Sequence, residues 1–315
     1  MNTAHAHGGT GHPAPGGISP GGSSLDEFSW WEWTFDPVFL IPLLLAVLYF
    51  RGYFAYRLRG GRVFPSWRPP LFALGVMVLA VALLSPIDKL ADHSFTWHMV
   101  QHDLMTLIGV PLLLLGAPFI PVIRGIPAAL RRAVFIPLAK NRLLRSAAWW
   151  LTHPLVAVVL FELTLLFWHF PPLYDRALFS EGMHYGMHSS FIFTAMLFWW
   201  NLINPHPFPS RLHLLLRMLM LFGSSVVNTA LSSIITFSPT TLYGYELLPG
   251  FWGLTMQEDQ FIGGALMWSM GAMLRLAAIS ILFFVYVRQE NARNPPLGVP
   301  LETPPSSAAK VHRRA

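Results

Sequence analysis

The sequence contains no cysteine among its 315 residues. Without thiols the chain can form neither a disulfide framework nor a thiolate metal site. Any bound metal must therefore be held by histidine, methionine or carboxylate. Charged residues are also scarce, at 11% of the chain, while 54% of the residues are hydrophobic. Soluble domains carry roughly 25% charged residues, so this shortage indicates that most of the chain lies in lipid.

Seven mostly apolar segments are candidates to cross a bilayer, which takes about 20 residues. They are predicted at residues 37–57, 70–86, 96–118, 154–170, 184–202, 213–237 and 261–287. The expected fold is an all-α integral membrane protein, in which a bundle of seven transmembrane helices occupies residues 36–289. Residues 1–35, which are rich in Gly, Pro and His, and residues 290–315 are expected to be disordered tails.

Positive charges fall at alternate ends of these segments. The connections after the first, third, fifth and seventh segments hold nearly all of the lysine and arginine, and the opposite side offers only Lys89 and Arg176. Because positive loops mark the cytoplasmic side, the N-terminus is predicted outside and the C-terminus in the cytoplasm. The net charge of +6 therefore indicates membrane topology, with lipid and not nucleic acid as the expected surroundings.

Five histidines gather at the predicted outer ends of three segments. His98 and His102 begin the third segment, His184 and His188 begin the fifth, and His169 ends the fourth. Residues four apart share one helix face, so three helices should present imidazoles at one depth. Imidazole and thioether ligands suit copper, with Asp103 or Asp259 orienting a ligand ring. The candidate metal ligands are His98, His102, His169, His184, His188, Met183, Met187 and Asp259. Helix-bridging hydrogen bonds and a haem or another cofactor are the alternatives.

Two further ionisable residues are predicted in mid-membrane, Glu162 in the fourth segment and Arg275 in the seventh. An unpaired charge at that depth is expensive. An ion pair between the two is the structural interpretation, and a path for protons or ions is the functional one.

Several separated motifs resemble the CtaG family of polytopic bacterial cytochrome c oxidase (caa-type) assembly factors. They are Met99-Val100-Gln101-His102 continuing to Leu115-Gly116-Ala117-Pro118, Trp168-His169-Phe170-Pro171-Pro172-Leu173-Tyr174-Asp175, Phe198-Trp199-Trp200, Asp259-Gln260, Gly263-Gly264 and Met267-Trp268. The positions that carry over from the family are His102, His169, His188, Asp259 and Gln260. The chain departs from the family at Asp103, where an apolar residue is usual, and at Met187, where an acidic one is frequent.

The resemblance implies a membrane-embedded assembly factor that binds copper at the outer face and helps deliver it to the catalytic subunit of the oxidase. The expected partners are that subunit and other copper chaperones. The expected location is the bacterial plasma membrane, with the site facing the periplasm or exterior. Such a protein acts by metal handover and is not an enzyme. A haem- or di-iron-binding membrane redox protein and a metal-free assembly scaffold are the alternative functions.

Overall fold

The computed structural model describes residues 33–58, 64–208, 211–245 and 253–294, and these residues form helices and no strand. Seven longer helical rods coincide with the seven predicted segments. They are α1 (Leu40–Leu58), α2 (Arg68–Leu84), the run α4 (Phe95–Asp103), η3 (Leu104–Gly109) and α5 (Val110–Leu115), then α10 (Pro154–Trp168), α12 (Glu181–Ile203), α13 (Leu214–Thr236) and α14 (Met256–Arg293). The prediction of an all-helical protein is confirmed.

Four helical stretches are long and apolar enough to span a membrane: Pro37–Arg57, Phe95–Leu115, Leu214–Thr236 and Met256–Arg293. A fifth span arises if α10 and the preceding helix α9 (Arg142–Leu151), which meet at a bend of 66°, count as one. The chain is therefore a multi-pass membrane protein by helix length and composition. The count of seven spans and the orientation of the termini stay predictions.

The last helix is longer than the sequence pattern indicates, because it begins at Met256 and not at residue 261, and it continues to Arg293. Its start is set by a capping box. Thr255 accepts a hydrogen bond from the Glu258 backbone N–H at 3.2 Å, while Glu258 accepts one from the Thr255 backbone N–H at 2.8 Å. Such reciprocal bonds satisfy backbone donors that a helix start otherwise leaves free. The residues just before 261 include polar ones that do not continue the apolar pattern, so the sequence did not indicate this first part of the helix.

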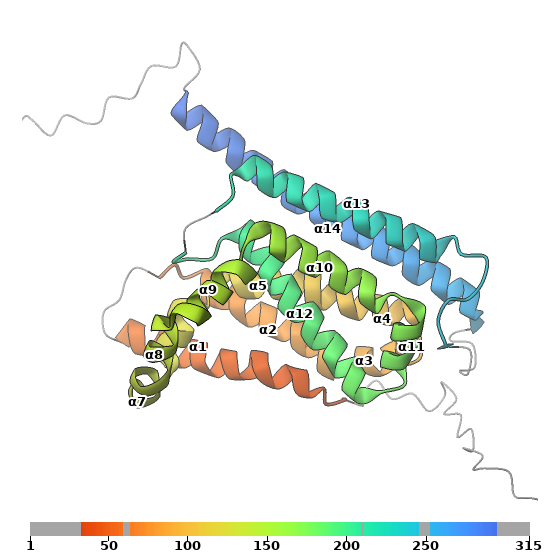
Figure 1. Cartoon of the computed structure of the whole chain (residues 1–315), viewed down its shortest axis with the longest axis horizontal. Coiled ribbons are helices and arrows are strands. Elements are labelled where there is room, and N and C mark those ends of the chain that lie inside the picture. The colour runs from red at the N-terminus through yellow and green to blue at the C-terminus, as the bar shows by residue number, and fades with distance from the viewer. Residues whose placement is uncertain (1–32, 59–63, 209–210, 246–252, 295–315) are drawn as a thin grey trace, which may run out of the picture.

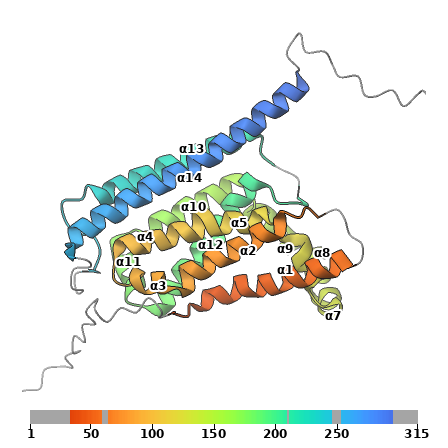
Figure 2. The same cartoon turned by 180° about the vertical axis from the view of Figure 1, so that it is seen from behind.

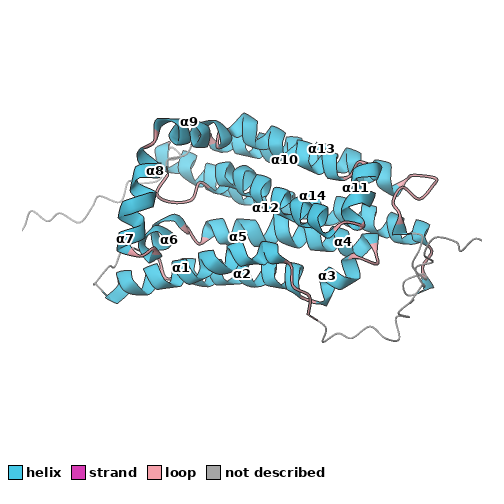
Figure 3. Cartoon of the chain, turned by 60° about the horizontal axis from the view of Figure 1, so that its bottom comes forward, coloured by secondary structure: helices cyan, strands magenta, loops and turns pink. Residues whose placement is uncertain are grey.

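The rods run roughly along one axis, and short helices close the two ends (Figure 3). One end carries α3 (Pro86–Ala91), α11 (Pro171–Leu178) and the start of α4; the other carries α6 (Phe119–Gly125), α7 (Ala128–Leu130), α8 (Ile136–Lys140) and α9. Helices α13 and α14 lie side by side along one flank of the bundle (Figures 1 and 2). The predicted histidine positions therefore belong to the end at α3, α4 and α11.

A close contact holds α14 against the histidine-bearing helix α4. A β-carbon added at Gly263 would lie 2.5 Å from the Phe95 ring, and one at Gly264 would lie 2.5 Å from the Thr236 hydroxyl of α13. Only glycine permits this approach, so the Gly263-Gly264 pair seats α14 between α4 and α13.

The helix after the α4 histidines widens into the π-helical stretch η3. Pro111 lacks a backbone N–H, so it cannot complete the ordinary ladder here. Trp199 of α12 donates its indole N–H to the Thr106 carbonyl at 2.8 Å and so satisfies one of the acceptors that the wider turn exposes. Stretches of this kind recur near functional sites, and this one ties the α4 run to α12.

Candidate metal centre

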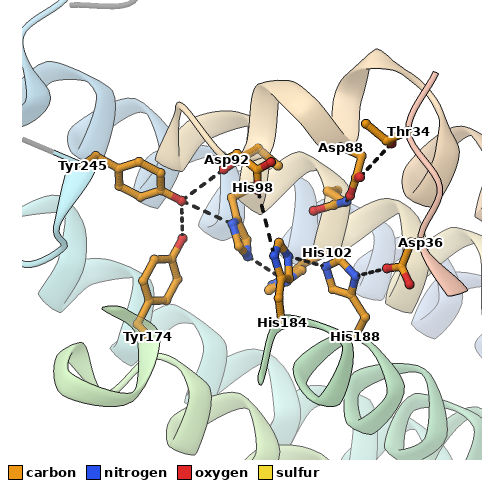
Figure 4. A network of polar contacts seen from close by, with 12 residues as sticks. Thr34, Asp36, Asp88, Asp92, His98, His102, Tyr174, His184, His188 and Tyr245 are labelled. Atoms are coloured by element: carbon orange, nitrogen blue, oxygen red, sulfur yellow. Dashed lines mark hydrogen bonds and ion pairs between the residues drawn. The ribbon is translucent and has the colours of Figure 1, made fainter. Parts of the chain in front are cut away.

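The structure brings together the five histidines that the sequence singled out. His98 and His102 project from α4, His184 and His188 from α12, and His169 caps the end of α10. The Nε2 atoms of His98 and His102 lie 3.0 Å apart, as do those of His184 and His188. The two pairs face each other: the rings of His98 and His184 stack at 5.4 Å between centroids (Figure 4).

Three of these residues form a compact ligand set. One ring nitrogen each of His98, His102 and His188 lies within 4.8 Å of the other two, and all three residues are buried. We refer to these three as the outer triad, after the side of the membrane on which the sequence predicts them. These three nitrogens could hold a metal ion, and imidazole suits copper as well as zinc, iron and nickel. The donor set therefore fits the metal that the family resemblance implies.

Asp36 anchors one member of the outer triad. Its Oδ2 accepts a hydrogen bond from His188 Nδ1 at 2.7 Å, and its Oδ1 accepts one from the Val38 backbone N–H at 2.7 Å. The carboxylate is buried at the N-terminus of η2 (Pro37–Phe39). A carboxylate that holds the far nitrogen of a ligating imidazole fixes its tautomer and orientation, so Nε2 of His188 is left to bind.

Two tyrosines hold the other side of the cluster. The Tyr245 hydroxyl lies 3.2 Å from His98 Nδ1, 2.8 Å from the Tyr174 hydroxyl and 3.2 Å from the Ala91 carbonyl, to which it donates (Figure 4). Both tyrosines are buried. His98 is thereby fixed through both of its ring nitrogens.

Acidic residues rim the cluster at the end of the bundle. Asp88 accepts hydrogen bonds from Thr34 at 2.7 Å and from Gln101 at 2.6 Å, and burial raises its pKa. Asp92 lies 3.9 Å from His184 Nδ1, and its side chain is half exposed. The rim therefore places carboxyl groups beside the imidazoles, and a bound cation would favour their ionised form.

Two imidazole nitrogens point away from this network and have no hydrogen-bond partner: His102 Nδ1 and His169 Nε2. His169 uses its other nitrogen, Nδ1, on the Leu165 carbonyl at 2.8 Å. Both residues line a cavity of about 20 Å3. Its other walls are Met99, Asp103, Thr106, Phe161, Leu165, Phe191, Asn228, Met267 and Arg275.

The expected ion pair between Glu162 and Arg275 is not formed, and that prediction was wrong. Neither oxygen of Glu162 has a hydrogen-bond partner, nor do Nε and Nη1 of Arg275, although both residues are buried. Asp103 is a second acidic group whose charge acts on the guanidinium. Arg275 therefore lies near two carboxyl groups, Asp103 and Glu162, without a hydrogen bond to either.

Asp259 binds the start of α4 in the structure, a role that the sequence did not indicate. Its carboxylate accepts hydrogen bonds from the Ser94 hydroxyl at 2.8 Å and from the backbone N–H groups of Phe95 and Thr96 at 2.7 and 3.3 Å. The two N–H donors belong to the first turn of α4, where a negative charge is favourable. Asp259 thus positions the helix that carries His98 and His102.

The remaining predicted residues pack as core. Met187 is buried and Met183 partly buried in an apolar cluster with Phe95 and Phe191. Gln260 bonds to the Ile235 and Thr240 carbonyls and to the Leu242 backbone N–H. Asp36 and Tyr245 were missed as partners of the histidines. The position of Asp36 directly before the first apolar segment, at the depth of the histidines, was the available signal for it.

Comparison with known proteins identifies a family. The family described as cytochrome c oxidase caa3 assembly factor matches residues 47–289. The chain is also similar to uncharacterized proteins of Mycobacterium leprae, with 26% identity over 266 residues, and of Mycobacterium bovis and Mycobacterium tuberculosis, each with 27% identity over 269 residues. These alignments cover 82% of this chain but only 40% of each relative. No solved structure matches.

Proposed function

Because the chain belongs to the family of cytochrome c oxidase caa3 assembly factors, we propose that it binds copper at the outer triad and delivers it to the catalytic subunit of the oxidase. The family assignment indicates a role in oxidase assembly and an association with the oxidase. Copper as the cargo, and the catalytic subunit as its recipient, are the parts we propose.

The observation that carries the proposal is the meeting of His98, His102 and His188 with nitrogen atoms within 4.8 Å of one another. These three imidazoles come from two helices, α4 and α12. The ring nitrogens of His98 and His188 that face away from the triad are held by Tyr245 and Asp36. Such outer partners are typical of metal-binding histidines, and hydrogen bonds serving only to join helices do not require them.

Handover to a partner needs a way in and out of the site, and His184 offers one. The Nε2 atom of His184 lies 3.0 Å from that of His188. The His184 side chain is 12% exposed, and the side chain of the adjacent Asp92 is 50% exposed. An ion can therefore meet Asp92 and His184 at the surface before it reaches the buried triad. We place docking of the oxidase subunit at this end of the bundle.

A haem-binding function fits the site less well. The cavity that borders His102 and His169 has a volume of about 20 Å3, whereas pockets for ligands of drug size measure roughly 300–1,000 Å3. A porphyrin would require the α4 and α12 helices to separate. Copper requires no such movement.

The test is titration of the detergent-purified full chain with Cu(I) against a chromophoric Cu(I) chelator in the absence of oxygen. We expect the wild-type chain to withdraw copper from the chelator, and we expect the triple variant of His98→Gln, His102→Gln and His188→Gln to bind far more weakly. The matched control is His206→Gln with His213→Gln, two histidines at the opposite end of the bundle. Equal copper retention in the triad variant and the wild type would contradict the proposal.

We also propose that all seven rods span the membrane, with the histidines on the outer side. The distribution of lysine and arginine supports this orientation. A reporter fused after Arg314 should then report cytoplasm, and one inserted near Pro249 should report the exterior. A cytoplasmic signal from the second reporter would place the histidine end on the wrong side for delivery.

A further inference from the structure

The cavity beneath the outer triad has the composition of a ligand site. Its walls include the imidazoles of His102 and His169 and the side chains of Met99 and Met267. His102 and His169 are 6% and 4% exposed, and Met99 and Met267 are 2% and 3% exposed. The neighbouring ring nitrogens, His102 Nδ1 and His169 Nε2, have no partner.

The hydrogen bonds around His98 determine the state of His102. A carbonyl only accepts, so the single Tyr245 hydroxyl proton goes to Ala91. His98 Nδ1 must then donate to the Tyr245 oxygen, which leaves His98 Nε2 as an acceptor. His102 Nε2 therefore donates to His98 Nε2. In neutral His102 the lone pair lies on Nδ1, the unpartnered nitrogen. These proton positions are assigned from the bonding partners.

The same reasoning applies to His169. Its Nδ1 must donate to the Leu165 carbonyl at 2.8 Å, so its lone pair lies on Nε2. Two buried imidazoles on the wall of one cavity thus each keep an unused lone pair. Lone pairs buried without a donor are unfavourable, and the occupant that satisfies both is either a cation or a water molecule that donates two hydrogen bonds.

We propose that the cavity is a second, inner copper position, held by His102 Nδ1, His169 Nε2 and the thioethers of Met99 and Met267. It rests on the proposed function, because copper would arrive through the outer triad. Thioether sulfur is a soft ligand that selects Cu(I), and a monovalent ion suits a buried site. The carboxylate of Asp103 lies on the same wall as the Arg275 guanidinium, so the arginine charge is not left unopposed.

The two positions share His102, and this makes them alternatives. A neutral imidazole has one lone pair. An ion in the outer triad takes Nε2 of His102 and requires the proton on Nδ1, whereas an ion in the inner position takes Nδ1 and requires the proton on Nε2. Movement of one ion between the positions therefore transfers one proton between the nitrogens of His102, with no net gain or loss. The inner position is where copper would be kept between delivery events.

X-ray absorption spectroscopy of the full chain loaded with one equivalent of Cu(I) tests the inner position, because it separates sulfur from nitrogen ligands. We expect a sulfur contribution in the wild type that disappears in Met99→Leu with Met267→Leu. Leucine nearly conserves the volume of methionine, so the fold should be retained. The matched control is Met183→Leu with Met187→Leu, which removes two thioethers of the same apolar cluster that do not line the cavity, and its sulfur contribution should persist.

The outcomes separate this inference from the proposed function. Bound copper with nitrogen ligands alone in the wild type would overturn the inner position, leave the outer triad intact and assign the cavity to water. Loss of sulfur in the Met183 and Met187 variant, and not in the Met99 and Met267 variant, would also overturn it. If the wild type binds no copper, both ideas fail. A second variant, His169→Gln, should likewise lose the sulfur contribution while it still binds one ion.

Discussion

The outer triad and the cavity beneath it are both buried, yet their polar atoms are satisfied to different degrees. His98 and His188 use both ring nitrogens in hydrogen bonds, to His102 and Tyr245 and to His184 and Asp36. Around the cavity, unpartnered atoms remain on His102, His169, Asp103 and Arg275. Bonds at both ring nitrogens hold His98 and His188 in one geometry. The cavity wall, in contrast, has polar atoms that only an added ligand or water can satisfy.

The largest loss of stability is expected when Arg275, the arginine in the cavity wall, is replaced. Arg275→Met would leave Asp103 and Glu162 buried without the cation whose charge acts on both. Folded yield and melting temperature, measured by size-exclusion chromatography of detergent extracts, should fall sharply. Adding Asp103→Asn and Glu162→Gln should restore much of the loss.

Arg288→Met, an exposed arginine on the same helix, is the control and should melt as the wild type does. If Arg275→Met alone is equally stable, Arg275 is not the counter-charge of the two carboxylates. The contrast between the two regions would then need another explanation.

A smaller effect, confined to metal binding, is expected from Asp36→Asn in the satisfied region. The amide oxygen can still accept from the Val38 N–H, but the amide nitrogen that replaces Oδ2 cannot accept from His188 Nδ1. His188 then loses its fixed tautomer, and loss of such a partner typically weakens metal binding by about 10- to 100-fold. Chelator competition measures the change.

Asp175→Asn serves as the control, because this carboxylate accepts from the Gly244 N–H at the same end of the bundle without a histidine contact. Its copper affinity should match that of the wild type. An Asp36→Asn variant with unchanged affinity would show that the bonded network does not tune the site.

The smallest expected effect is that of Tyr245→Phe. The change removes one hydroxyl and leaves the Tyr174 hydroxyl, the Ala91 carbonyl and His98 Nδ1 without that partner, at a cost of about 1–3 kcal/mol. The melting temperature should fall modestly while the helical circular dichroism is kept. Tyr243→Phe, which removes a bond to the His169 carbonyl at 3.1 Å, should have a similar effect on stability without touching His98. An unchanged melting temperature in both would argue against a rigid outer network.

The sequence predicted the helical rods and the gathering of the five histidines because both follow local rules. Apolar length identifies a helix in lipid, and i,i+4 spacing places His98 with His102 and His184 with His188 on shared faces. The bonds of Asp36 to His188 and of Tyr245 to His98 join residues 152 and 147 positions apart. No local pattern encodes such pairs, since they depend on how the helices pack.

Asp259 and Glu162 have contacts that the sequence did not indicate, for the same reason. Asp259 was considered near a metal because of its depth, but packing at Gly263 and Gly264 places it over the N-terminus of α4, where it bonds to Ser94. Glu162 was paired with Arg275 because they were the two charges predicted in mid-membrane. Asp103, assigned to the outer end, lies close enough to compete for the same arginine. Depth along a helix can be predicted from sequence, whereas the direction in which a side chain points into the bundle cannot.

The most direct test of the account is an anomalous difference map at the copper absorption edge, from crystals of the full chain loaded with Cu(I). We expect a peak bordered by the Nε2 atoms of His98, His102 and His188, or by His102 Nδ1 and His169 Nε2 within the cavity, with occupancy that sums to one ion per chain. A peak elsewhere in the chain, with neither position occupied, would contradict it.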